Sequence, residues 1–163
     1  MRLPLQDLWS MHPKLLGHPT DLPRLGALAL QRAGHASPVQ AGVNHGGRAS
    51  TAEVEWLAQD LALLETHDGN RVTEDGAEAV ALAYANVWAG WVVKRRLQRS
   101  LRADWLLQNE EGWLALEVSG TAEGDPVARL KEKRQQVALC PLSAQRLALV
   151  IAFDRPSILA DSP

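Results

Sequence analysis

The sequence predicts an α/β protein in which a small mixed sheet, with a β-hairpin that carries a pair of acids, is flanked by helices and preceded by a helical and loop N-terminal arm. Three stretches indicate this fold class. Residues 102–121 hold two alternating runs around Asn109-Glu110-Glu111-Gly112, a pattern typical of a β-hairpin. Residues 79–93 would be apolar all around a helix, and residues 146–153 form the continuous apolar run of a strand buried on both faces. A chain of 163 residues, 46% of them apolar, can bury one sizeable core.

Residues 1–48 differ in composition from the rest and are interpreted as a Pro/Gly-rich N-terminal arm. They contain five of the nine prolines, half of the twelve glycines and four of the five histidines. One helix is expected at about residues 22–32, with Gly34 as its stop, and the remainder, including residues 41–47, is expected to be loop. The histidine spacings match no metal-ligand pattern. The arm lacks the apolar periodicity for a core of its own, so we expect it to lie against the main domain or to hold a protein partner.

Residues 49–163 are interpreted as the main domain. A capping-box pattern at Ser50–Glu53 and apolar residues at helical spacing predict a helix over residues 51–66. A second helix is expected over about residues 74–100, as the buried central prop of the domain. Its apolar run of about fifteen residues is too short to span a membrane. One cysteine and an N-terminus without a signal-peptide pattern favour a cytoplasmic location.

Basic side chains gather at the predicted C-terminal end of that second helix. Two interpretations stay open. Cations at this position complement the helix macrodipole. They also suit a phosphate backbone, and a formal net charge of −2 excludes bulk electrostatic binding to nucleic acid but not a local basic strip. The five cations are Lys94, Arg95, Arg96, Arg99 and Arg102.

The hairpin carries the strongest indication of chemistry. If Gln108 faces Trp113, then Asp104 faces Glu117 and Arg102 faces Ser119, while the opposite face is wholly apolar. Facing carboxylates repel each other unless a cation lies between them or Arg102 neutralises them. Such a pair suits Mg²⁺, which takes one or two carboxylates and can supply a hydroxide near neutral pH. A third carboxylate, Glu78, could complete the site. The alternative is an ordinary surface ion pair between Asp104 and Arg102.

Two further elements follow the hairpin. Asp125-Pro126 predicts the start of a helix that runs to about Val137 and carries Lys131, Lys133 and Arg134. The buried strand over residues 146–153 comes next, and the tail from Ser157 is expected on the surface.

The order of these elements, together with the two acids, resembles the PD-(D/E)XK nuclease superfamily over about residues 74–153. The resemblance implies that Asp104 and Glu117 hold Mg²⁺ or Mn²⁺. Two departures from the superfamily pattern are present. Ser119 stands where the lysine of (D/E)-x-K is expected, so Lys131, or Lys133, would have to reach back from the following helix. The first strand of the superfamily core is expected to be missing or reduced to a few residues.

The function implied by this resemblance is a metal-dependent DNA nuclease, or a nuclease-like subunit of a defence or repair assembly. Asp104, Glu117 and Lys131 would be its catalytic residues. Phosphate contacts would come from the five cations before the hairpin and from Arg134. One alternative is an inactive nuclease-like domain that binds nucleic acid or a protein partner. Another is a small adaptor or immunity-type protein in which the acid pair is only structural.

Overall fold

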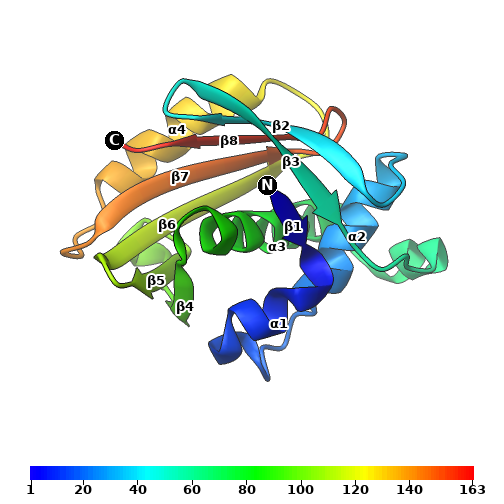
Figure 1. The fold of residues 1–163 in the computed structure, drawn as a ribbon, viewed down its shortest axis with the longest axis horizontal. Coiled ribbons are helices and arrows are strands. Elements are labelled where there is room, and N and C mark those ends of the chain that lie inside the picture. Colours follow the sequence, from blue (N-terminus) through cyan, green and yellow to red (C-terminus); the bar gives the residue numbers. More distant parts are fainter.

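In the computed structural model, which describes residues 1–163, a single mixed sheet of eight strands runs through the molecule (Figure 1). The strands lie in the order β1-β3-β2-β8-β7-β6-β5-β4. Pairing is parallel between β1 and β3, β2 and β8, and β6 and β7, and antiparallel elsewhere. The predicted α/β class is therefore confirmed, with a larger sheet than expected. No helix of the protein combines the length and apolar character that a membrane crossing requires.

The bounds of the elements are as follows. The strands are β1 Arg2–Pro4, β2 Val39–His45, β3 Arg48–Glu55, β4 Val92–Arg96, β5 Trp105–Asn109, β6 Gly112–Thr121, β7 Gln145–Ala152 and β8 Ser157–Asp161. The α-helices are α1 Leu8–Met11, α2 Leu22–Arg32, α3 Gly69–Ala89 and α4 Pro126–Ala138. Four short 3₁₀ helices are η1 Leu5–Asp7, η2 Pro13–Leu15, η3 Leu61–Thr66 and η4 Arg99–Leu101.

Helices cover both faces of the sheet. On one face α3 crosses β6 and β7, with α2 packed against it, and together they bury the larger apolar core. On the other face α4 lies along β6, β7 and β8 and closes a smaller core around Ala115, Val137 and Ala148 (Figure 1). The apolar side of the predicted hairpin belongs to the larger core, since Trp105, Leu107, Leu114, Leu116 and Val118 are all buried, as are Leu149 and Ile151.

The helix α3 is the buried central helix that its sequence predicts, but it ends earlier than predicted. The Asp68 carboxylate caps its first turn by accepting hydrogen bonds from the backbone N–H groups of Asn70 and Arg71, both at 3.0 Å. The helix ends at Ala89 because Gly90 adopts the left-handed conformation, with φ of 67°. The prediction of a helix to residue 100 is wrong. Residues 92–96 instead form β4, an edge strand where little or no strand was expected.

Three further predictions are wrong. The tail from Ser157, expected on the surface, forms β8 in the interior of the sheet, with Ile158 and Ala160 buried. Residues 51–66 form most of β3 and the short helix η3 rather than one α-helix, and residues 41–47 form most of β2 rather than a loop. In β3 the buried side chains Ala52 and Val54, followed by Trp56, alternate with a period of two. The same residues also fit a helical spacing, and pairing with β1 and β2 decides between the two periods.

The first 48 residues contribute β1 and β2 to the common sheet and α2 to the larger core. Glycines let α2 and α3 approach closely. A Cβ atom added to Gly76 would lie 2.8 Å from the Cβ of Ala29, and one added to Gly26 would lie 3.0 Å from the Cβ of Ala79. The backbones of the two helices are therefore in close contact at these glycines, which leaves no room for larger side chains.

Buried His12 joins this N-terminal region to the centre of the protein. Its Nε2 lies 3.1 Å from the Leu82 carbonyl oxygen, and its Nδ1 lies 3.1 Å from the backbone N–H of Val93. The second contact makes Nδ1 an acceptor, so the ring is neutral and Nε2 donates to Leu82. Burial lowers the pKa of His12 to about 4.

Because this pKa is depressed, neutral His12 stabilises the protein fully when the pH is above the ordinary pKa of histidine. The stabilisation is lost as the pH falls toward 4. We expect the free energy of unfolding to drop by roughly 2 kcal/mol between pH 7 and 4.5 on account of this group. Urea unfolding of wild type and His12→Gln at both pH values measures it, since the variant lacks this titration. The same pH dependence in both proteins would contradict the assignment.

Candidate functional site

A polar cleft of about 660 Å³ opens between α3, α4, the loop after β4 and the start of β5. Only two of its fifteen lining residues are hydrophobic. Residues 18–20, from the N-terminal region, form one wall. The ionisable side chains of the lining, apart from His18, are the acids Glu74, Asp75, Glu78, Asp104 and Glu117 and the bases Arg71, Arg96, Arg99 and Lys133.

The hairpin has the predicted register. Gln108 pairs with Trp113 and Leu106 with Ala115. The ladder ends at the pair of Trp105 and Leu116, so the predicted pairs Asp104–Glu117 and Arg102–Ser119 are not part of it. The backbone N–H of Asp104 donates to the Leu116 carbonyl at 2.9 Å. The Asp104 carboxylate then turns toward β6, where Oδ2 accepts the backbone N–H of Val118 at 2.9 Å. This contact places the carboxylate in the cleft beside Glu117.

Glu117 is the most deeply buried acid of the cleft, with 2% of its surface exposed. Its Oε1 accepts hydrogen bonds from Lys133 Nζ at 2.6 Å and from Gln136 Nε2 at 2.7 Å. Burial raises the pKa of Glu117 to about 7, helped by the negative charge of Asp104 and opposed by the hydrogen bond and positive charge of Lys133. The ammonium group of Lys133 therefore does not offset burial and the Asp104 charge together.

Ser119, which stands in the place of the expected lysine, is fully buried and accepts a hydrogen bond from Arg129 Nε at 3.0 Å. The neighbouring backbone N–H of Gly120 donates to Glu74 Oε2 at 3.2 Å. Arg129 and Glu74 therefore tie α4 and α3 to the same point of β6. Serine carries no charge, so this position lacks the cation that the resemblance predicts.

A second acid–base pair forms the opposite wall. Both guanidinium NH₂ groups of Arg96 donate to the Glu78 carboxylate, at 2.5 and 2.7 Å, and the guanidinium lies 4.8 Å from the centre of the Trp105 ring. Burial raises the pKa of Glu78 to about 7, against the effect of Arg96. The neighbouring Asp75 also has a raised pKa, chiefly through burial. Arg96 thus holds Glu78 beside the other acids that line the cleft.

The lysine predicted to be catalytic, Lys131, lies on the exposed side of α4 and does not line the cleft. Lys133, the other lysine considered, lines the cleft instead. Helical geometry explains the difference, because Arg129, Lys133 and Gln136 are spaced by four and three residues and share one face of α4. Lys131 points about 160° away from Lys133 on the same helix.

The other predicted basic residues are divided between the cleft and the surface. Arg96 and Arg99 line the cleft, whereas Lys94, Arg95 and Arg102 are exposed along the edge strand β4 and the loop that follows it. None of the five cations lies at the C-terminus of α3, which ends at Ala89, so the macrodipole interpretation is wrong for that helix. Arg134 lies outside the cleft lining and pairs with Asp161 at 3.1 Å. Arg102 forms no ion pair with Asp104.

No group of three or more histidine, cysteine, aspartate or glutamate side chains is arranged as a metal site. Asp104 and Glu117 still fit a hard divalent cation. They supply two carboxylates, which with water molecules is a common ligand set for Mg²⁺. The raised pKa of Glu117 beside Asp104 indicates a negative charge that such a cation would relieve.

Comparisons with protein-family models, with curated proteins and with solved structures found no match to this chain.

Proposed function

We propose that this protein is a metal-dependent nuclease, or the nuclease-like subunit of a defence or repair assembly, that hydrolyses DNA phosphodiesters in the acidic cleft. The observation that carries the proposal is the pairing of Asp104 with Glu117, whose Oε1 lies 2.6 Å from Lys133 Nζ. The order α3-β4-β5-β6-α4-β7 supports it, because this is the element order of the PD-(D/E)XK superfamily that the sequence resembles.

In this proposal Asp104 and Glu117 hold Mg²⁺ or Mn²⁺. The bound metal would polarise the phosphodiester and make a water molecule more acidic. Lys133 replaces both the missing lysine at position 119 and Lys131, and its ammonium group stabilises negative charge on the phosphate. Arg99 in the cleft and the exposed cations Lys94, Arg95 and Arg102 would contact the DNA backbone.

The test is cleavage of plasmid and single-stranded DNA with Mg²⁺, with Mn²⁺ and with EDTA. We expect Asp104→Asn to lower the cleavage rate at least about a hundredfold, because a metal contributes several kcal/mol to such reactions. Glu110→Gln is the matched control, since Glu110 is an exposed acid in the turn of the same hairpin. Equal rates for Asp104→Asn and wild type would contradict the assignment.

The second candidate function is a nuclease-like domain that binds DNA or a protein partner without cleaving. Ser119, held by Arg129 Nε at 3.0 Å in the lysine position, favours it. Wild type that binds DNA in a salt-dependent manner, with no cleavage under either metal, would establish this function in place of the first.

A further inference from the structure

A second candidate binding site lies at the other end of α3, around Trp88. Ten residues separate Trp88 from Glu78, so about 15 Å of helix lies between this site and the acidic cleft. The indole of Trp88 is 43% exposed although its neighbours Tyr84 and Trp91 are buried. It stands between two hollows of about 300 Å³ and 450 Å³ and lines both.

The orientation of Trp88 is fixed by two other rings. Tyr84, one helical turn earlier, is parallel to it within 5°, with ring centres 6.1 Å apart. His45, at the end of β2, lies 4.1 Å from Trp88 and places its Nδ1 2.8 Å from the Tyr84 hydroxyl. An exposed aromatic ring that is already held in place loses little conformational entropy when a ligand stacks on it.

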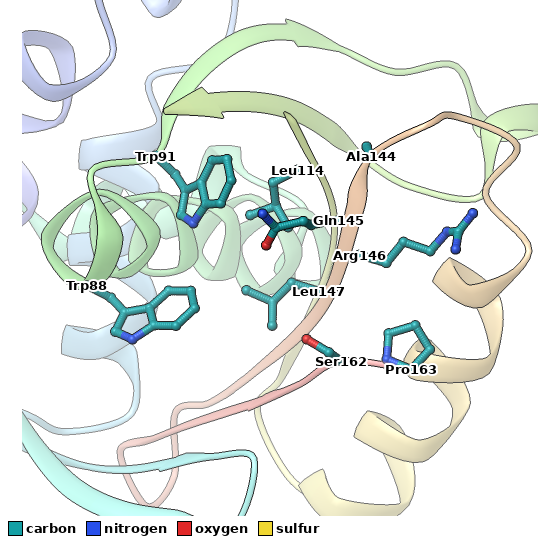
Figure 2. A pocket seen from close by; sticks show the side chains of 9 residues that line it. All are labelled: Trp88, Trp91, Leu114, Ala144, Gln145, Arg146, Leu147, Ser162 and Pro163. Atoms are coloured by element: carbon teal, nitrogen blue, oxygen red, sulfur yellow. The ribbon is translucent and has the colours of Figure 1, made fainter. Parts of the chain in front are cut away.

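The smaller hollow combines aromatic and apolar walls with a hydrogen-bonding side chain. Figure 2 shows the rings of Trp88 and Trp91 on one side and the carboxamide of Gln145 extending toward them from β7. Leu114 and Leu147 complete the apolar walls. The Nε1–H of Trp91 is buried and has no acceptor within the protein, which is costly. This hollow suits a flat, partly polar ring system.

The larger hollow, on the other side of Trp88, carries a positive charge. Arg48 lines it together with Ser50 and His45, and Arg48 is exposed and forms no ion pair. A free guanidinium group is a good phosphate ligand. A surface for ring stacking therefore lies beside a surface for an anion.

We propose that the Trp88 site binds a nucleotide, with its base stacked on Trp88 in the smaller hollow and its phosphate on Arg48. The carboxamide of Gln145 favours adenine, because it can donate to and accept from the two neighbouring groups on the adenine edge. An aromatic side chain of a peptide would leave both Gln145 and Arg48 without a partner. The nucleotide is either free or one unit of a single strand, since both offer the same base and phosphate.

The test uses ¹⁵N-labelled full-length protein in EDTA, titrated with AMP, with adenosine and with a single strand of ten deoxyadenylates. Binding is followed through the indole N–H signals of the tryptophans. We expect the signals of Trp88 and Trp91 to shift. Base stacking of this kind predicts that Trp88→Ala weakens binding roughly 5- to 150-fold. Trp113→Ala is the matched control, because Trp113 is 41% exposed and lines neither hollow.

Two more variants separate the parts of the site. Arg48→Ala should weaken binding of AMP and leave that of adenosine unchanged, and Gln145→Leu should reduce the preference for adenine over thymine. Binding of AMP as tight as that of the strand identifies a free nucleotide as ligand, and binding of the strand alone identifies a single strand.

Wild type that binds neither AMP nor the strand at millimolar concentration would overturn the proposal. So would equal losses in Trp88→Ala and Trp113→Ala. Because no metal is present and no cleavage is measured, the result does not depend on whether the acidic cleft is a nuclease site.

Discussion

Glu117→Gln is expected to abolish metal-dependent cleavage and, at pH 8, to raise the free energy of unfolding by roughly 3 kcal/mol. The stability gain follows from the pKa of Glu117, which is raised to about 7 in the folded protein. Because the pKa is raised, wild type is most stable when Glu117 is protonated. Its free energy of unfolding falls as the pH rises from the ordinary pKa of glutamate through 7. Glutamine stays neutral, keeps the bonds from Lys133 and Gln136, and can donate to Asp104.

Guanidinium chloride unfolding at pH 5 and pH 8 checks this expectation, since the gain should be much smaller at the lower pH. Glu132→Gln on α4 is the control, because Glu132 is exposed and pairs only with Arg129, at 3.1 Å. We also expect Mg²⁺ to raise the melting temperature of wild type at pH 8 and not that of Glu117→Gln. A variant less stable than wild type at pH 8 would show that Glu117 serves mainly as the partner of Lys133.

Gly120→Ala is expected to destabilise the fold by about 3 kcal/mol or more, at the upper end of overpacking effects. A Cβ atom at this position would lie 2.4 Å from the Thr73 carbonyl oxygen and 3.0 Å from the Cβ of Ala77. Neither the backbone of α3 nor that of β6 can move without disturbing the acidic cleft. The N–H of Gly120 also bonds Glu74, so displacement would break that contact.

Thermal and urea unfolding measure this effect, with Gly42→Ala as the control. Gly42 lies in β2 and has open space where the methyl group would go, so alanine should be neutral or slightly stabilising there. Similar stability of Gly120→Ala and wild type would mean that α3 does not lie as close to the sheet as the structure shows.

The parts of the fold that the sequence predicts well are those specified by neighbouring residues. The hairpin register follows from the turn at Asn109–Gly112 and the alternation on both sides of it, because each partner lies within about fifteen residues of the other. The start of α4 at Asp125-Pro126 is equally local. The strand β3 is different, since its side chains fit two periods and its partners β1 and β2 lie elsewhere in the chain.

The candidate site likewise has contacts that the local sequence predicts and contacts that it does not. The hairpin register predicts that Asp104 and Glu117 lie close together, although the ladder ends at Trp105 and the hydrogen bond from Val118 positions the Asp104 carboxylate. The contact between Lys133 and Glu117 depends on which face of α4 lies against the sheet. The spacing of Arg129, Lys133 and Gln136 places these three residues on one face, and Lys131 on another. The pair of Glu78 and Arg96 required the break at Gly90, which turns the chain back so that β4 runs beside α3.

The position of β8 has a consequence for how the protein is made. This strand lies between β2 and β7, yet it is the last of the eight strands to be synthesised. Until it emerges from the ribosome, β2 and β7 each present an open edge, with its backbone N–H and C=O groups unpaired. The two halves of the sheet therefore cannot join until β8 has been synthesised. Nascent chains that stall before residue 157 are expected to bind chaperones and to aggregate.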